Sequence, residues 1–211
     1  NNVLQRWKRK EMVTEEPLNK ALKAYQKTLE LDEKGRRTDD VKEQLTELKS
    51  QYIQSGINAY YNQNLDEALA DFEMVLNVNE MDMFEGVVDT LITQYAGIIA
   101  RDRGDYKKAA EYYTRLAAMN YGGPAVYLNV KNDYLQLGDS AMAIEIMEDA
   151  FNKYEDSVNI VANLVDLYIK TGNIEQGLEK VNEAIVENPD KGELYYWKGR
   201  LILNTEDEDR I

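Results

Sequence analysis

Carboxylates are the most abundant chemically versatile side chains in this sequence, because Asp and Glu together number 39 among 211 residues. Neighbouring pairs occur at Glu15-Glu16 and Asp39-Asp40, and a run extends from Glu206 to Asp209. General acid–base catalysis needs a desolvated carboxylate pair that faces across a pocket at a defined spacing. These carboxylates stand on expected solvent faces of helices or close to the end of the sequence. We therefore interpret them as solvated groups, and we expect no catalytic residues and no enzymatic activity.

Histidine and cysteine, the side chains most used in nucleophilic and metal chemistry, do not occur in the sequence. Their absence excludes zinc fingers, thiol nucleophiles and Ser-His-Asp triads. The acidic residues also lack the spacing of an EF-hand calcium loop. We therefore expect neither a metal site nor a cofactor.

Charge and hydropathy restrict the partners. The formal net charge of -14 argues against nucleic acid, because such a surface repels phosphates. The basic stretch Arg6–Lys10 is interpreted as a solvated helix face. No apolar run approaches the roughly 18–20 residues of a membrane span. The sequence opens with Asn1-Asn2 rather than Met, so we expect a processed or truncated amino terminus.

The elements that must position any site recur along the chain. Gly104, Gly138 and Gly172 are evenly spaced, and each precedes an Asp or Asn. Glycine accepts the left-handed backbone that ends many helices, and the following side chain can cap the next helix. A similar junction between two helices precedes these three at Asn64, but it lacks the glycine. Its spacing to the next copy is about seven residues too long, which indicates an insertion near residues 79–86.

Each ending is followed by a small residue and, four positions later, by a large one. These pairs are Ala68 and Phe72, Ala109 and Tyr113, Ala143 and Met147, and Gly177 and Val181. Residues four apart share one helix face, and a small residue lets two helices approach closely. In the third copy Tyr127, Val130, Tyr134 and Leu137 also follow the period of a helix. The pattern therefore predicts packed helix pairs and an all-α fold.

This pattern resembles the tetratricopeptide repeat (TPR), a 34-residue unit of two antiparallel helices whose length matches the interval between the three glycines. The resemblance implies a right-handed superhelical α-solenoid of stacked helix pairs. Its units would be 49–89, 90–123, 124–157 and 158–191, with a degenerate repeat and connecting helix in 1–48 and the first helix of an incomplete fifth repeat in 192–211. The glycine expected within each first helix stands at Gly56, Gly97 and Gly199, but Lys131 and Val165 replace it elsewhere.

The resemblance also implies a binding surface, because first helices line the concave face on which solenoids bind partners. The side chains at the implied positions include Gln94, Arg101, Asn132, Gln136, Asn159, Asp166, Lys170, Tyr196 and Arg200. Such groups could hydrogen-bond an extended peptide, and the alternative is a solvated groove without a ligand. We expect a non-catalytic scaffold that binds a protein or peptide partner on this face.

Aromatic clusters leave a second function open. Tyr60-Tyr61, Tyr112-Tyr113 and Tyr195–Trp197 could hold a sugar if their rings were exposed. The alternative function is therefore a glycan- or envelope-associated binding protein, although most of these rings coincide with positions expected in the core. The stretches Glu30–Gly35 and Gly56–Tyr60 resemble exported TPR proteins of Bacteroidetes. That resemblance implies a periplasmic or otherwise exported protein, with a cytoplasmic location as the alternative.

Two segments stand outside the regular pattern. The last helix is expected to end near Asn204 and to leave Leu194, Trp197 and Leu201 partly uncovered, because solenoid ends normally carry a polar capping helix. We expect self-association through this end, or a continuation of the chain. The insertion 79–84 contains two Met and a Phe, which would form an adaptable contact surface or an extra helical turn that packs on its own repeat.

Overall fold

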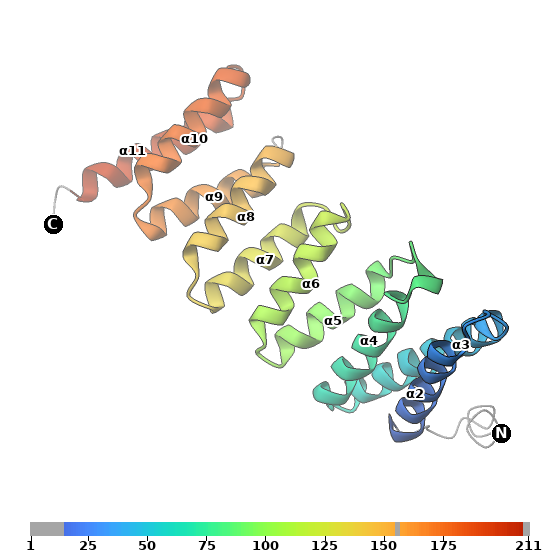
Figure 1. The fold of residues 1–211 in the computed structure, drawn as a ribbon. Helices are drawn as coiled ribbons and strands as arrows, with labels where there is room; N and C mark the ends of the chain where they lie inside the picture. Colours follow the sequence, from blue (N-terminus) through green and yellow to red (C-terminus); the bar gives the residue numbers. More distant parts are fainter. Residues whose placement is uncertain (1–14, 155–156, 209–211) are drawn as a thin grey trace. The chain divides into compact units, whose positions relative to one another are not determined.

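The computed structural model describes residues 15–154 and 157–208, and every regular element in these ranges is helical (Figure 1). The prediction of an all-α fold is thus confirmed for the described part of the chain. The elements are α2 (Glu15–Leu31), α3 (Thr38–Tyr61), α4 (Leu65–Asn79), the 3-10 turn η1 (Asp82–Phe84), α5 (Thr90–Asp102), α6 (Tyr106–Ala118), α7 (Pro124–Gln136), α8 (Ser140–Lys153), α9 (Val158–Thr171), α10 (Ile174–Glu187) and α11 (Gly192–Glu208). The basic stretch Arg6–Lys10 lies outside the described residues, as do the side chains of Glu15-Glu16 and of 206–211.

The chain forms two compact units, residues 1–112 and 113–211. In the first unit α3 packs against α2 and α4, and α4 packs against α5. Position 49 falls inside α3, which is a single helix of 24 residues. In the second unit α8 packs between α7 and α9, while α9, α10 and α11 all contact one another. First helices (α7, α9, α11) thus alternate with second helices (α8, α10) along the second unit.

The helix endings follow the glycine pattern of the sequence. Gly104, Gly138 and Gly172 have φ angles of 78°, 75° and 72°, the left-handed conformation that ends a helix. Where this glycine is missing, Gln63 takes the same conformation with φ 63°. The predicted caps form at two of the four starts, since Asp105 accepts from the backbone N–H of Lys108 and Asp139 from that of Met142.

Two predicted caps are wrong. Neither Asn64 nor Asn173 caps its helix through the side chain. The Nδ2 group of Asn173 instead donates to Oγ1 of Thr171 at 2.9 Å, so its amide is engaged at the end of the preceding helix.

The predicted small and large residues form the cores. The exposed fraction is 0% for Ala68, Ala109 and Ala143, and at most 3% for their large partners Phe72, Tyr113, Met147 and for Val181. Gly177 is buried, and a Cβ placed on it would lie 2.9 Å from Cδ2 of Tyr168 and 3.0 Å from Cδ2 of Leu201. Helix α10 therefore approaches α9 and α11 closely at this glycine, as the pattern predicted.

The insertion packs on its own unit. Its 3-10 turn buries Phe84 to an exposed fraction of 5%. The ammonium of Lys49 lies 4.1 Å from the centre of this ring and donates to Oδ1 of Asn79 at 2.7 Å. Burial lowers the pKa of Lys49 from its usual value. Of the two interpretations of this segment, the structure supports the helical turn that packs on its own repeat, because Phe84 is buried.

The expectation for the last helix is wrong. Leu194, Trp197 and Leu201 are buried, with exposed fractions of 3%, 9% and 0%. Helices α9 and α10 cover this side of α11, because α11 completes the packing of the preceding helix pair. The exposed large side chains of α11 are instead Tyr195, Tyr196, Ile202 and Leu203.

Candidate functional site

Polar side chains of α7, α9 and α11 form a row across the first helices of the second unit. Arg200 of α11 pairs with Asp166 of α9, and their Nη1 and Oδ1 atoms lie 2.7 Å apart. The guanidinium also lies over the ring of Trp197, 5.2 Å from its centre. Both charged side chains remain partly exposed, at 36% for Arg200 and 45% for Asp166. Two residues that were predicted separately are therefore in direct contact.

A second interaction joins α7 to α9. Lys131 Nζ donates to Oδ1 of Asn163 at 2.7 Å. Asn163 in turn donates through Nδ2 to the backbone carbonyl of Asn159 at 2.8 Å and to its side-chain Oδ1 at 3.0 Å. The amide of Asn159 thus belongs to a connected set of hydrogen bonds that runs from one first helix to the next.

The two interactions form one electrostatic site. Burial lowers the pKa of Lys131, the positive charge of Lys170 lowers it further, and the negative charge of Asp166 opposes both effects. Lys131, Asp166 and Lys170 are therefore close enough to influence each other. We call Lys131, Asn159, Asn163, Asp166, Lys170 and Arg200 the polar row.

Solved structures share this arrangement of helices. The chain resembles a TPR protein from Bacteroides fragilis with a TM-score of 0.52 and 14% identity, over 75% of this chain and 85% of that one. It also resembles the MamA protein with a TM-score of 0.50 and 15% identity, over 77% of this chain and 85% of that one. The chain has the tetratricopeptide repeat fold. No protein-family model and no curated protein matches the sequence.

Residues of the polar row can be numbered by their positions in the predicted TPR units. Asp166 and Arg200 are each the ninth residue of their predicted units, and Asn132 is the ninth residue of the unit before. Equivalent positions of successive first helices thus meet at the Asp166–Arg200 pair. Asn132 and Gln136 are exposed on α7, and Lys170 and Tyr196 are exposed on α9 and α11.

Gln94 and Arg101 belong to the first unit. Both are half-buried and lie seven residues apart on α5, which places them on one face of that helix. A separate contact links the first helices there, since Tyr60 OH lies 3.1 Å from Oδ2 of Asp102. This hydrogen bond raises the pKa of Tyr60. The first unit therefore has polar first-helix contacts of its own.

Sequence reasoning missed Lys131 and Asn163 as members of the site. Lys131 stands where the consensus of the first helix has glycine, and this departure was the available signal. A long cationic side chain at a position normally kept small projects from the helix and can reach the neighbouring helix. Asn163 gave no such signal, because an isolated Asn within a helix is unremarkable until its partner is known.

The aromatic clusters divide into core and surface. Tyr112, Tyr113 and Trp197 are buried, whereas Tyr195 is 49% and Tyr196 62% exposed. The rings of Tyr196 and Trp197 meet edge-to-face at an interplanar angle of 73°. Tyr196 and Trp197 therefore offer no pair of coplanar exposed rings on which a sugar could stack.

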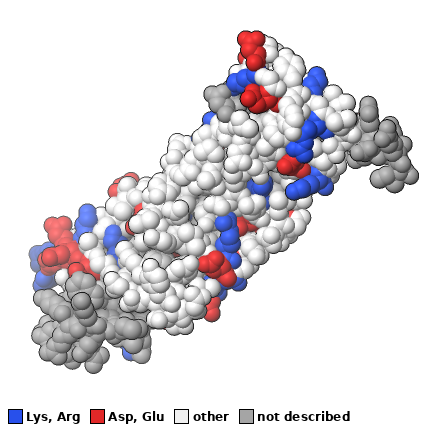
Figure 2. All heavy atoms as spheres, turned by 180° about the vertical axis from the view of Figure 1, so that it is seen from behind, with Lys and Arg blue, Asp and Glu red and all other residues white. Residues whose placement is uncertain are grey.

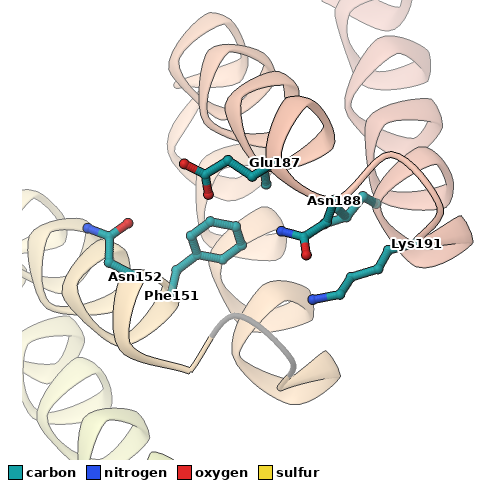
Figure 3. Close-up of a pocket in the computed structure, with 7 residues that line it drawn as sticks. Phe151, Asn152, Glu187, Asn188 and Lys191 are labelled. Carbon is teal, nitrogen blue, oxygen red and sulfur yellow. The ribbon is translucent and has the colours of Figure 1, made fainter.

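A small hollow in the second unit is a further candidate (Figure 3). It measures about 270 Å³ and is lined by Phe151, Asn152, Ala184, Glu187, Asn188, Lys191 and Leu194. Figure 3 shows Asn188 and Lys191 extending toward the ring of Phe151, with Asn152 on the other side. An apolar floor with amides and both signs of charge at its rim suits a single side chain of a partner.

Charged side chains of both signs occur on one face of the molecule (Figure 2). On the face seen in Figure 2, Lys or Arg often lies beside Asp or Glu, and large areas carry no charged side chain. Among the described residues no cluster of acidic side chains could hold a metal ion. No helix in the described ranges is long and apolar enough to cross a bilayer.

Proposed function

We propose that this protein is a non-catalytic interaction scaffold that binds an extended segment of a partner protein along the polar row. The observation that carries the proposal is the Asp166–Arg200 ion pair, 2.7 Å long and made by equivalent positions of successive first helices. Equivalent positions on successive first helices present hydrogen-bonding groups in a line. An extended peptide, which repeats its own backbone groups in a line, is the ligand that fits it.

The chemistry of the row favours a peptide with an acidic residue. The pKa of Lys131 is lowered in part by the charge of Lys170, so the two ammonium groups repel each other. A partner carboxylate placed near both would relieve this repulsion and form charge-assisted hydrogen bonds. The exposed amides of Asn132 and Asn159 can serve the peptide backbone, because each side chain both donates and accepts.

Affinity selection from a random peptide library tests the proposal. Peptides displayed on phage are selected on the intact protein, and a selected peptide is titrated by calorimetry. We expect enrichment of sequences with Asp or Glu, and a loss of affinity of about tenfold, or 1.4 kcal/mol, in Lys131→Ala or Lys170→Ala.

Matched variants separate the site from the rest of the surface. Glu145→Gln changes an exposed carboxylate on the second helix α8 and is expected to leave the affinity unchanged. Gln94→Ala with Arg101→Ala reports whether the face of the first unit takes part. Equal affinity of the polar-row variants and the wild type would refute the proposal. Selection of glycans on an array, lost in Tyr196→Ala, would favour the alternative function.

The exported location implied by the Bacteroidetes resemblance remains part of the proposal. A partner segment would then meet the protein outside the cytoplasm. Fractionation of native cells with an antibody against this chain tests the location, and recovery with the cytoplasmic fraction would contradict it.

A further inference from the structure

The second helices α8 and α10 end in equivalent ways. Helix α8 ends at Lys153, and the next residue, Tyr154, is its C-cap. Helix α10 ends at Glu187, and the next residue, Asn188, is its C-cap. The two endings stand 34 residues apart, which is one repeat. Side chains at equivalent places of these two junctions can therefore be compared one by one.

The junction at the end of α8 is filled by the chain itself. The ring of Tyr154 packs edge-to-face on the ring of Tyr127, with 5.7 Å between the ring centres. Lys153 Nζ donates to Tyr127 OH at 3.2 Å and to the backbone carbonyl of Ala117 at 3.4 Å. Two aromatic rings and one lysine side chain thus occupy the space between the end of α8 and its neighbours α6 and α7.

The equivalent junction at the end of α10 has one ring instead of two. Phe151 stands 34 residues after Ala117 and supplies a ring from α8. Val161 stands 34 residues after Tyr127 and supplies none. Within the described ranges, no second ring packs against Phe151.

The hollow shown in Figure 3 lies where this second ring would be. Asn188 is the equivalent of Tyr154, and its shorter side chain extends toward the ring of Phe151 without reaching the volume of a tyrosine. The hollow measures about 270 Å³. Because an apolar cavity of about 150 Å³ already accommodates benzene, the hollow has room for a substituted aromatic ring.

The floor of the hollow is apolar. Phe151, Ala184 and Leu194 line it and have exposed fractions of 6%, 7% and 3%. A ring placed on this floor would meet the ring of Phe151, and aromatic pairs attract each other in edge-to-face or offset geometry. The floor therefore favours an aromatic group over a polar one.

The rim of the hollow is polar and open. Asn152 and Glu187 line it and are exposed, so a side chain that is carried by a backbone can enter from solvent. The carboxylate of Glu187 can accept a hydrogen bond from a phenol, as Glu148 accepts one from Tyr168 OH in the same unit. A tyrosine side chain satisfies both parts of the hollow, with its ring on the floor and its hydroxyl at the rim.

We propose that this hollow binds a tyrosine side chain of a partner polypeptide. Its ring packs on Phe151 as the ring of Tyr154 packs on Tyr127 one repeat earlier. Tyrosine is a residue that partner surfaces often bury in such pockets, because it brings a large rigid ring with a polar end. No residue of the polar row lines the hollow, so this inference goes beyond the proposed function and does not depend on it.

An NMR titration of the intact protein tests the site, with N-acetyl-L-tyrosinamide as the probe. We expect saturable shifts at the backbone amides of Phe151, Ala184 and Leu194. N-acetyl-L-phenylalaninamide lacks the hydroxyl and is expected to bind about fivefold more weakly, for the loss of one hydrogen bond. N-acetyl-L-leucinamide lacks the ring and is expected to bind more weakly still. Equal affinity of the leucine and tyrosine compounds would contradict a site for a ring.

Matched variants place the probe in the hollow. Asn188→Tyr gives α10 the residue that follows α8, and its own ring is expected to abolish binding. Ala184→Leu fills the hollow from the floor and is expected to do the same. Val186→Tyr adds the same ring at a position of α10 that is 81% exposed, and it is expected to leave binding unchanged. The dispersion of the amide spectrum verifies the fold of each variant.

A peptide identifies the source of the tyrosine. A short glycine–serine peptide with one central tyrosine is expected to shift the same amides, with an affinity at least equal to that of the probe. Binding of the probe without binding of the peptide would indicate a site for a small phenol and would overturn the proposal. Probe shifts that are absent from the hollow, or that persist in both filled variants, would overturn it as well.

The polar row is tested separately. Lys131→Ala is expected to bind N-acetyl-L-tyrosinamide as the wild type does, because Lys131 does not line the hollow. A loss of probe binding in this variant would contradict a self-contained site at Phe151. Failure of the probe to bind the wild type would leave the selection of acidic peptides on the polar row unaffected, so the two proposals fail independently.

Discussion

Asp166 and Arg200 hold the same position in two successive first helices, and their side chains meet in an ion pair of 2.7 Å. Because the two residues stand one full repeat apart in the sequence, their contact shows that successive first helices lie side by side. It also belongs to the polar row, the face proposed above to bind a partner. Its energetic role in folding is nevertheless small, since both side chains keep more than a third of their exposure.

The first prediction concerns the strength of this pair. A double-mutant cycle of Asp166→Asn and Arg200→Gln should give a coupling energy of about 0.2–1 kcal/mol in the free energy of unfolding, the range of exposed ion pairs. The coupling should weaken in high salt, because mobile ions screen exposed charges. Urea unfolding of the four proteins at low and high salt measures both effects. A coupling well above this range would show that the pair is far more desolvated than the structure indicates.

The second prediction concerns the titration of Lys131. Its pKa is lowered by burial and by the charge of Lys170, and is held up by Asp166. Lys170→Ala should therefore raise the pKa of Lys131 toward its usual value, whereas Asp166→Asn should lower it further. NMR titration of the Cε resonance of Lys131 measures these shifts. Shifts in the same direction for both variants would contradict the geometry of the site.

The same titration bears on stability. Because the folded-state pKa of Lys131 is below its unfolded value, the unfolded chain binds more protons between the two values. The contribution of Lys131 to the free energy of unfolding should therefore rise with pH through this alkaline window. Comparison of wild type with Lys131→Met in this range isolates the effect.

The third prediction compares two glycines on helices that touch. Gly177→Ala places a Cβ within 3.0 Å of atoms of Tyr168 and Leu201, so the core must shift, at a cost of about 1–3 kcal/mol. Gly199→Ala places a Cβ that meets no atom of the described residues within 4 Å, and it should stabilise α11 by about 0.5–1 kcal/mol, because glycine weakens a helix interior. Urea unfolding at low protein concentration measures both variants. Equal changes in the free energy of unfolding for the two variants would mean that helix propensity, rather than close packing, governs the response to alanine at Gly177.

The fourth prediction concerns the 3-10 turn. Phe84→Ala removes a buried ring and should lower the free energy of unfolding by about 3–5 kcal/mol. It should also raise the pKa of Lys49, because water would reach an ammonium that the structure buries. Phe84→Leu keeps most of the apolar volume and is the matched control for burial. A Phe84→Ala variant as stable as the wild type would show that the turn does not pack on α3 in solution.

Much of the fold could be predicted from residue types and spacing. Evenly spaced glycines indicated where helices end, because few other residues adopt the left-handed conformation at low cost. The small-to-large spacing, as in Ala143 and Met147, identified core residues, because residues four apart share one face of a helix. The caps were less predictable: Asp139 caps its helix and Asn173 does not, since an amide can find another partner nearby.

The site was only partly predictable. Repeat positions put Asp166 and Arg200 on the first helices, but the sequence alone could not show that they touch. The hydrogen bond from Lys131 to Asn163 depends on how far one side chain reaches across the space between two helices. The hollow around Phe151 draws its lining from α8, α10, α11 and the connection before α11, so no local pattern encodes it.

The sequence by itself determined which residues repeat, where the glycine-marked helices end, and which side chains are small enough for close packing. These are local properties of the backbone and of helix faces. Only the tertiary structure decided which of those faces are covered. Trp197 is buried and Tyr196 is exposed although they are neighbours, because α9 and α10 pack against one side of α11 and leave the other open. The burial of Trp197 depends on which helices lie beside α11 in space, and the repeat pattern alone does not contain that information.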